Sequence, residues 1–168
     1  MPETESSCAI RPAKPDEAEI LSALALRSKA YWGYTDEFMA ACHDELTYTP
    51  EQICAPQFTF YVCAIDDSII GFHALQRLSA NIMELEALFV EPSHIGKGIG
   101  KKLIEHAKDH ARQLGASSLV IQGDPNSRKF YLAAGAVHSG SRKSNSIAGR
   151  QLPVFTVDLT GKEATGQE

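Results

Sequence analysis

Three glycines at alternate positions lie in the segment VEPSHIGKGIGKKL, residues 90–103. The apolar run LEALFV precedes them and helix-spaced apolar residues follow, so they lie between a predicted strand and a predicted helix. Such a junction exposes main-chain N–H groups beside the positive end of a helix, which suits phosphate or pyrophosphate. A tight turn without a ligand would need only one or two glycines. Gly96, Gly98 and Gly100 therefore predict an anion site.

Two common nucleotide motifs do not fit this junction. A dinucleotide fingerprint that starts at Gly96 would need glycine at position 101, where the chain has Lys101. A P-loop that ends in Gly100-Lys101 would need glycine in place of Ile95 and serine or threonine in place of Lys102. A nucleotide-binding domain of either kind is disfavoured.

Two carboxylates alternate along the predicted strand that leads to the glycines. Strict alternation would place Glu84 and Glu86 on the same side of the sheet as Leu88 and Val90. An unpaired buried carboxylate is costly, so one of them is a candidate general base, acting directly or through water. The alternative is that one or both lie at the solvated start of the strand.

The composition indicates one globular domain over the 168 residues, with 43% apolar and 22% charged side chains. A net charge of −5 argues against a nucleic-acid partner. No apolar run is long enough for a membrane span, and the N-terminal MPETESS has neither the basic nor the apolar region of a signal peptide. We expect a cytoplasmic protein.

The cysteines and histidines predict no metal site. Four cysteines occur without CxxC spacing, and we expect all of them to be free thiols in a reducing compartment: Cys8, Cys42, Cys54 and Cys63. His106 and His110 are four residues apart on a predicted helix, but no third ligand is evident. These two histidines are read as a helix face that touches the core.

Periodicity and turn residues predict a three-layer α/β domain with a mixed sheet. The predicted strands cover 8–11, 58–66, 68–78, 81–90, 117–123, 136–141 and 152–159, and the predicted helices cover 14–30, 35–46, 49–56, 99–115 and 124–135. The polar ends, 1–7 and 160–168, are expected to be disordered tails.

Two segments at a fixed separation resemble the GNAT-type N-acetyltransferase superfamily. Residues 95–100 are similar to its motif A, Q/R-x-x-G-x-G/A, although Ile95 replaces the usual Arg or Gln. DPNSRKFYLAAGA at 124–136 resembles the D-P-N-A-x-x-F-Y-x-x-x-G-F/A segment, with Ser127 in place of alanine. The likeness runs from about residue 58 to residue 159. Further segments, RSKAYWGY and SIAGRQLP, are similar to uncharacterised bacterial members.

The resemblance implies the acyl-CoA N-acyltransferase fold, a sandwich whose mostly antiparallel sheet of six or seven strands is splayed at its centre. It further implies a single N-acetyltransferase domain over residues 1–168 that transfers the acetyl group of acetyl-CoA to a primary amine of a small molecule. The transfer would be a direct attack in a ternary complex, without a metal, and family habit suggests a homodimer. The alternative is a catalytically inactive acyl-CoA sensor, which Ile95 and the undecided base favour.

The resemblance also assigns the donor site. The main chain of Leu88, Phe89 and Val90 would bind the pantetheine arm as an added strand. The pyrophosphate would lie on the junction that comprises Gly96, Lys97, Gly98, Ile99, Gly100 and Lys101, where the two lysines add positive charge.

Tyr131 matches the family tyrosine near the thioester sulfur, where it would give the thiolate a proton. A phenol has a pKa of about 10 and a thiol roughly 8.5, so Tyr131 would stay protonated without any large shift of its pKa. The alternative is an aromatic pair with Phe130 packed at a helix–sheet seam. Asn126 matches a position that bonds the cofactor arm, and Asp124-Pro125-Asn126 is also a good helix start.

The acceptor side is less defined. The family places an acid at about the distance of Glu84 before the glycines, so Glu84 is the first choice for the base and Glu86 the second. Four residues could surround the acceptor: Trp32, Tyr34, His73 and Arg150, the last in a basic loop with Arg142 and Lys143. The alternative is that they serve only as packing or as solvated surface.

Overall fold

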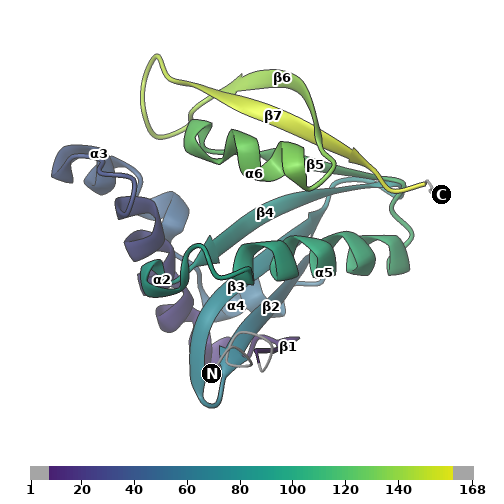
Figure 1. The fold of residues 1–168 in the computed structure, drawn as a ribbon, viewed down its shortest axis with the longest axis horizontal. Coiled ribbons are helices and arrows are strands. Elements are labelled where there is room, and N and C mark those ends of the chain that lie inside the picture. Colours follow the sequence, from purple (N-terminus) through teal and green to yellow (C-terminus); the bar gives the residue numbers. More distant parts are fainter. Residues whose placement is uncertain (1–7, 161–168) are drawn as a thin grey trace.

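The computed structural model describes residues 8–160, which form one seven-stranded sheet with helices on both faces (Figure 1). The strand order is β1-β2-β3-β4-β5-β7-β6, and only β4 and β5 are parallel neighbours. The strands are β1 (Ala9–Pro12), β2 (Phe58–Ile65), β3 (Ser68–Arg77), β4 (Ile82–Val90), β5 (Ser118–Gln122), β6 (Val137–Lys143) and β7 (Gln151–Asp158). The predicted mixed, mostly antiparallel α/β fold is confirmed. Of the tails predicted at 1–7 and 160–168, every residue except Thr160 lies outside the described residues.

The helices follow the predicted order with shorter bounds. They are α2 (Ala18–Ala30), α3 (Asp36–Ala41), α4 (Pro50–Cys54), α5 (Ile99–Gln113) and α6 (Arg128–Ala133), with short 3₁₀ turns η1 (Pro15–Glu17), η2 (Asp44–Leu46), η3 (Pro92–His94) and η4 (Pro125–Ser127). The predicted helix over 35–46 is therefore divided into α3 and η2. Thr49 begins α4 as expected, since its hydroxyl accepts a hydrogen bond from the Gln52 N–H at 3.1 Å.

Two apolar layers enclose the sheet. On one face, Leu21 and Leu24 of α2 pack with Phe72 of β3. On the other face, Ile104 and Ala107 of α5 pack with strand residues of the central sheet. Among residues 8–160 no helix is long and apolar enough to cross a membrane.

The sheet opens between β4 and β5. These strands pair only where Ile82–Leu85 lies beside Ser118–Ile121, whereas β4 continues to Val90. Beyond Leu85, β5 remains paired with β7 and β4 remains paired with β3. The edge of β4 from residue 86 to residue 90 that faces β5 therefore lacks a strand partner among the described residues, which is the splay that the resemblance implied.

A β-bulge in β4 overturns the expected alternation of side chains. Leu85 pairs with Leu75 and Ala87 pairs with Ala74, so Glu86 is the extra residue. After the bulge, each side chain of β4 points to the opposite face of the sheet from the one that strict alternation would give. Leu85 packs in the layer beneath α5, whereas Ala87 packs in the layer beneath α2. Glu84 and Glu86 therefore do not share a side with Leu88 and Val90, both of which pack with residues of α5.

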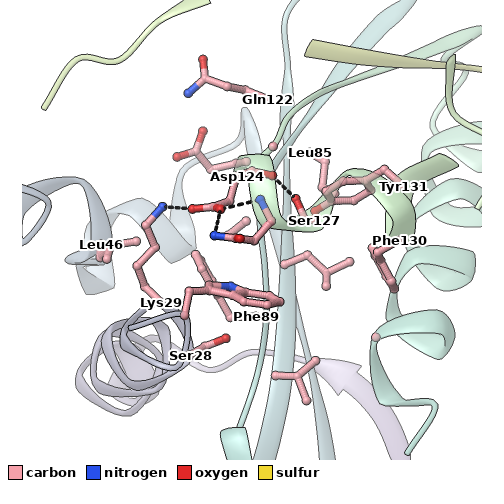
Figure 2. A pocket seen from close by; sticks show the side chains of 18 of the residues that line it. Ser28, Lys29, Leu46, Leu85, Phe89, Gln122, Asp124, Ser127, Phe130 and Tyr131 are labelled. Atoms are coloured by element: carbon pink, nitrogen blue, oxygen red, sulfur yellow. Dashed lines mark hydrogen bonds and ion pairs between the residues drawn. The ribbon is translucent and has the colours of Figure 1, made fainter. Parts of the chain in front are cut away.

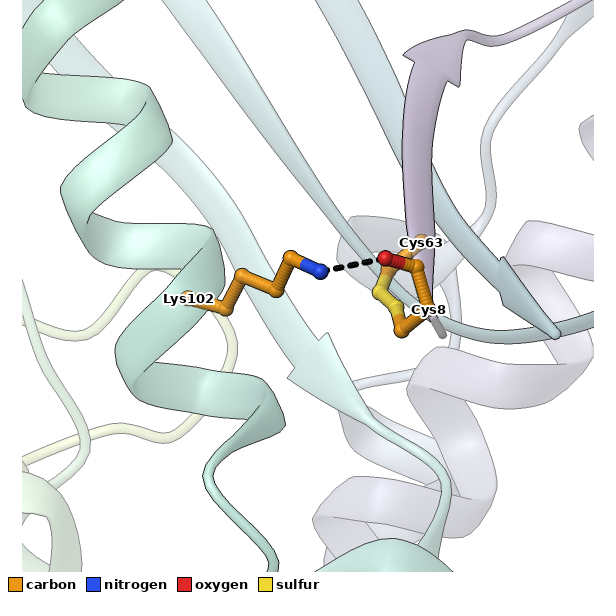
Figure 3. Close-up of a disulfide and its surroundings, with 3 residues drawn as sticks. All are labelled: Cys8, Cys63 and Lys102. Carbon is orange, nitrogen blue, oxygen red and sulfur yellow. Dashed lines mark hydrogen bonds between the residues drawn. A yellow bond between two sulfur atoms is a disulfide. The ribbon is translucent and has the colours of Figure 1, made fainter. Parts of the chain in front are cut away.

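Cys8 and Cys63 form a disulfide, so the expectation of four free thiols is wrong for this pair (Figure 3). Their Cα atoms are 6.0 Å apart because β1 pairs antiparallel with β2 beside them. The ammonium of Lys102, in the first turn of α5, donates a hydrogen bond to the carbonyl of Cys8. Cys42 and Cys54 are free.

A histidine cluster fills part of the layer beneath α5. His73 is fully buried on β3, and its Nε2 lies 2.9 Å from Nδ1 of His106, which stacks on His110. Tyr61 contacts all three rings. Burial, followed by the two neighbouring histidines, lowers the pKa of His73 to about 3. The Nδ1 of His73 has no hydrogen-bond partner in the described part of the chain.

The buried His73 makes stability depend on pH. Its pKa is about 6.5 when unfolded and about 3 when folded, so the unfolded chain binds the proton first. We expect the free energy of unfolding to be unaffected above this range and to fall by up to about 1.4 kcal/mol per pH unit as the pH decreases from the upper to the lower value. Urea denaturation across this range tests the slope. His73→Phe should flatten it, whereas the exposed His43→Phe should not; equal slopes in both variants would contradict the assignment.

Candidate active site

A cavity of about 790 Å³ occupies the opening of the sheet. Its walls come from β4 residues Glu84 to Val90, the turn that leads into α5, the segment between β5 and α6, and the end of α2 (Figure 2). Its size lies in the range of small-molecule and cofactor sites. The splay of the sheet therefore encloses a cavity instead of packed side chains.

The junction before α5 presents unpaired main-chain donors to this cavity. Gly96 and Gly98 both have φ near +85°, a conformation that other residues adopt at a cost. The first α5 hydrogen bond runs from the Lys102 N–H to the Gly98 carbonyl, at 3.1 Å. Within residues 8–160 the N–H groups from Gly96 to Lys101 have no acceptor. A pyrophosphate fits this set of donors at a helix N-terminus.

The third glycine of the motif has a packing role. A Cβ at Gly100 would lie 3.1 Å from the Phe130 ring, so glycine lets the first turn of α5 approach α6. Lys101 lines the cavity, whereas Lys97 does not. Ile99 is buried in the core and also does not line the cavity, so its predicted contribution is confined to its main chain.

Tyr131 lies in the cavity wall on α6. It is only 7% exposed, and its ring contacts Phe130 and Phe155. Its hydroxyl makes no hydrogen bond to any described residue. Burial, and to a smaller extent the charge of Asp124, raises the pKa of Tyr131 well above its ordinary value. The expectation of an unshifted phenol is therefore wrong, but the shift acts in the direction that keeps the phenol protonated.

Asp124 connects both sides of the cavity, a role that sequence reasoning missed. Its carboxylate pairs with the Lys29 ammonium at 2.8 Å (Figure 2). It also accepts hydrogen bonds from the Tyr34 hydroxyl and the Asn126 N–H. Arg150 donates to the same hydroxyl at 2.8 Å. Tyr34 and Arg150 therefore do not line the cavity themselves but hold its wall, whereas Lys29, Asp124 and Asn126 line it.

The two candidate bases differ in their surroundings. Glu84 accepts a hydrogen bond from Arg142 at 3.0 Å and is thereby paired with a cation. Glu86 has no such partner among the described residues. Burial, then the charges of Glu84 and Glu45, raise the pKa of Glu86 to about 7. A carboxylate of this kind can exchange a proton near neutral pH.

Of the remaining predicted acceptor residues, Trp32 reaches the cavity and His73 does not. Trp32 follows α2, is 46% exposed and lines the cavity. The ring of His73 lies beneath α5 against His106, on the other side of β3 from the expected acceptor space. The main-chain segment of Leu88, Phe89 and Val90 lines the cavity as predicted.

Residues 25–136 match the acetyltransferase (GNAT) family, and the chain therefore belongs to it. A streptothricin acetyltransferase of Streptomyces lavendulae is 38% identical over 65 residues, which is 38% of this chain and 34% of that protein. Matches to curated relatives span only 34% to 54% of those proteins' lengths.

Solved structures share the fold over nearly the whole chain. The PaiA N-acetyltransferase of Thermoplasma acidophilum, solved in complex with coenzyme A, superposes with a TM-score of 0.75 at 23% identity, covering 90% of this chain and 99% of that one. An aminoglycoside 6′-N-acetyltransferase complexed with coenzyme A gives a TM-score of 0.71 at 16% identity, with 93% and 99% covered. At these identities the likeness defines the fold.

The ion pair beside Glu86 leads to a test of the electrostatics. Arg142→Gln should leave Glu84 without its cation and increase the repulsion on Glu86, so the pKa of Glu86 should rise further. Carbon-detected NMR titration of the glutamate carboxyls measures it. Lys143→Gln removes the same charge one residue along, at a side chain without an ion pair to any residue within 8–160, and should have a smaller effect. An equal shift in both variants would contradict the assigned pair.

Proposed function

We propose that the protein transfers the acetyl group of acetyl-CoA to the primary amine of a small molecule. The observation that carries the proposal is the set of N–H groups from Gly96 to Lys101 without an acceptor in the described part of the chain, of which those of Gly96, Gly98, Gly100 and Lys101 belong to residues that line the cavity. Family membership and the coenzyme A complexes of two structural neighbours support the same donor.

The donor would be held along the edge of β4 and by the start of α5. Main-chain groups of Leu88, Phe89 and Val90 line the cavity on an edge without a strand partner, so the amides of a pantetheine arm can pair with them as an added strand. The N–H groups before α5 would bind the diphosphate, with Lys101 adding positive charge. Asn126 lines the cavity beside this path.

Glu86 is the better candidate for the base. It is unpaired with any cation, and its pKa of about 7 places it where it can take the proton of an amine near neutral pH. Glu84, the first choice from sequence, is neutralised by Arg142. In direct attack the amine nitrogen forms a bond to the acetyl carbon, the carbon–sulfur bond breaks, and Glu86 receives the proton that leaves nitrogen, directly or through water.

Tyr131 would act at the sulfur. Because burial raises its pKa, its hydroxyl keeps its proton and can donate it, or a hydrogen bond, to the thiolate as charge develops. Its hydroxyl makes no bond to a described residue, so it is free to do so. Phe130 and Phe155 fix the ring from the sides.

Thiol release from acetyl-CoA across a panel of primary amines tests this function. Wild-type protein should turn over at least one amine, and Tyr131→Phe should lower kcat by about 10²-fold or more while the Kd for acetyl-CoA stays within about twofold. Tyr61→Phe, which removes a hydroxyl outside the cavity, should be neutral. Binding of acetyl-CoA without release on any amine would instead favour an acyl-CoA sensor, and no binding would reject both.

The pKa of Glu86 predicts the pH dependence. Below about 7 the carboxyl is protonated and cannot act as a base, so kcat/KM, expressed per neutral amine, should rise about tenfold per pH unit and level off above that value. Glu86→Gln should lower the plateau by about 10²-fold and remove the break. The exposed Glu19→Gln should keep the wild-type profile. A break that persists in Glu86→Gln would assign the base to another group.

A further inference from the structure

The charges that line the cavity are not balanced at its acceptor end. Two of its carboxylates are each paired with a cation, Asp124 with Lys29 at 2.8 Å and Glu84 with Arg142 at 3.0 Å. Lys101, a third cation of the lining, lies in the first turn of α5, where the donor diphosphate would lie. Among the lining residues of the described chain, the acceptor end of the cavity therefore has no cation that is not already paired with a carboxylate.

Two further carboxylates of the lining, Glu45 and Glu86, have no cationic partner within residues 8–160. Glu45 lies on η2 and accepts a hydrogen bond from the Ser146 hydroxyl, which leaves its charge uncompensated. Its charge contributes to the raised pKa of Glu86, so the two carboxylates act on the same space. A positively charged ligand group would neutralise them.

Tyr48 provides an independent sign of a polar ligand at this place. Its ring packs edge-on against Phe60 and Phe72, and the residue is only 5% exposed. It lines the cavity, yet its hydroxyl makes no hydrogen bond to any described residue. His73 Nδ1 is the only described side-chain nitrogen or oxygen atom that is both buried and unpartnered, so the Tyr48 hydroxyl is open to the cavity, where a ligand donor or acceptor can reach it. The charges of Glu86 and Glu45 both act on this hydroxyl.

Trp32 adds an aromatic face to the cavity lining. It lines the cavity and is 46% exposed, so its indole is open to a ligand. Ammonium groups bind over indole rings by cation–π attraction. Carboxylate, hydroxyl and indole together form the kind of surface that recognises an ammonium.

We infer that the acceptor is an amine with a second positive charge, whose reacting nitrogen lies at Glu86 while its second ammonium is held by Glu45, the Tyr48 hydroxyl and the Trp32 ring. This inference rests on the proposed function of the same cavity. Acetylation removes one of the two charges of such a molecule. The product is therefore bound more weakly than the substrate, which favours its release.

Calorimetric titration of the protein with coenzyme A present tests the inference. The ligands are unbranched α,ω-diaminoalkanes of three to eight carbons, each matched with the amino alcohol of the same length. At least one diamine should bind about tenfold more tightly than its amino alcohol. Glu45→Gln should abolish this preference by weakening the diamine far more than the amino alcohol, and Tyr48→Phe should reduce it. Asp44→Asn removes a neighbouring, fully exposed charge outside the cavity and should retain it.

The inference is overturned if no diamine binds detectably, if diamines and amino alcohols bind equally, or if Glu45→Gln and Asp44→Asn weaken the diamine to the same extent. Because the experiment measures binding, it tests the second ammonium site even if the protein transfers no acetyl group. Acetyl transfer to monoamines without any preference for diamines would contradict the second ammonium site but would remain consistent with the proposed function.

Discussion

The structure depends on one interrupted interaction, the pairing of β4 with β5. Four residues of each strand pair, and then β5 stays with β7 while β4 stays with β3. The opening leaves main-chain groups of β4 without a strand partner and gives the cavity its volume. Unpaired main-chain groups are costly unless a ligand or water forms hydrogen bonds with them. A ligand that contains amide groups can form these hydrogen bonds along the open edge of β4.

The bulge at Glu86 lies where this pairing ends. Because of this extra residue, the side chains that follow it point to the opposite face from the one expected. Ala87 and Phe89 therefore pack in the layer beneath α2, and Leu88 and Val90 pack in the layer beneath α5. The bulge also places Glu86 on the side of η2, where the charge of Glu45 reaches it. A local irregularity of the sheet therefore places in the cavity lining a carboxylate, Glu86, whose pKa is about 7.

Sequence patterns predicted the elements and the glycine junction because their signals are local. The spacing of Leu103 and Ala107 along α5 and the run of glycines before it are read directly from neighbouring residues. The bulge was not predictable, since 81–90 reads as an uninterrupted strand and only its partner β3 reveals the extra residue. The ion pair of Asp124 joins residues 95 positions apart and the disulfide joins residues 55 apart, and such contacts have no local signature.

The central claim is that the main-chain nitrogens before α5 bind the diphosphate of the donor. Amide chemical shifts of ¹⁵N-labelled protein, recorded on adding coenzyme A and then pantetheine, which lacks the diphosphate, test it most directly. The account predicts that the amides of Gly96, Gly98 and Gly100 shift strongly with coenzyme A and little with pantetheine. Amides that do not respond to coenzyme A, or that respond equally to both compounds, would contradict it.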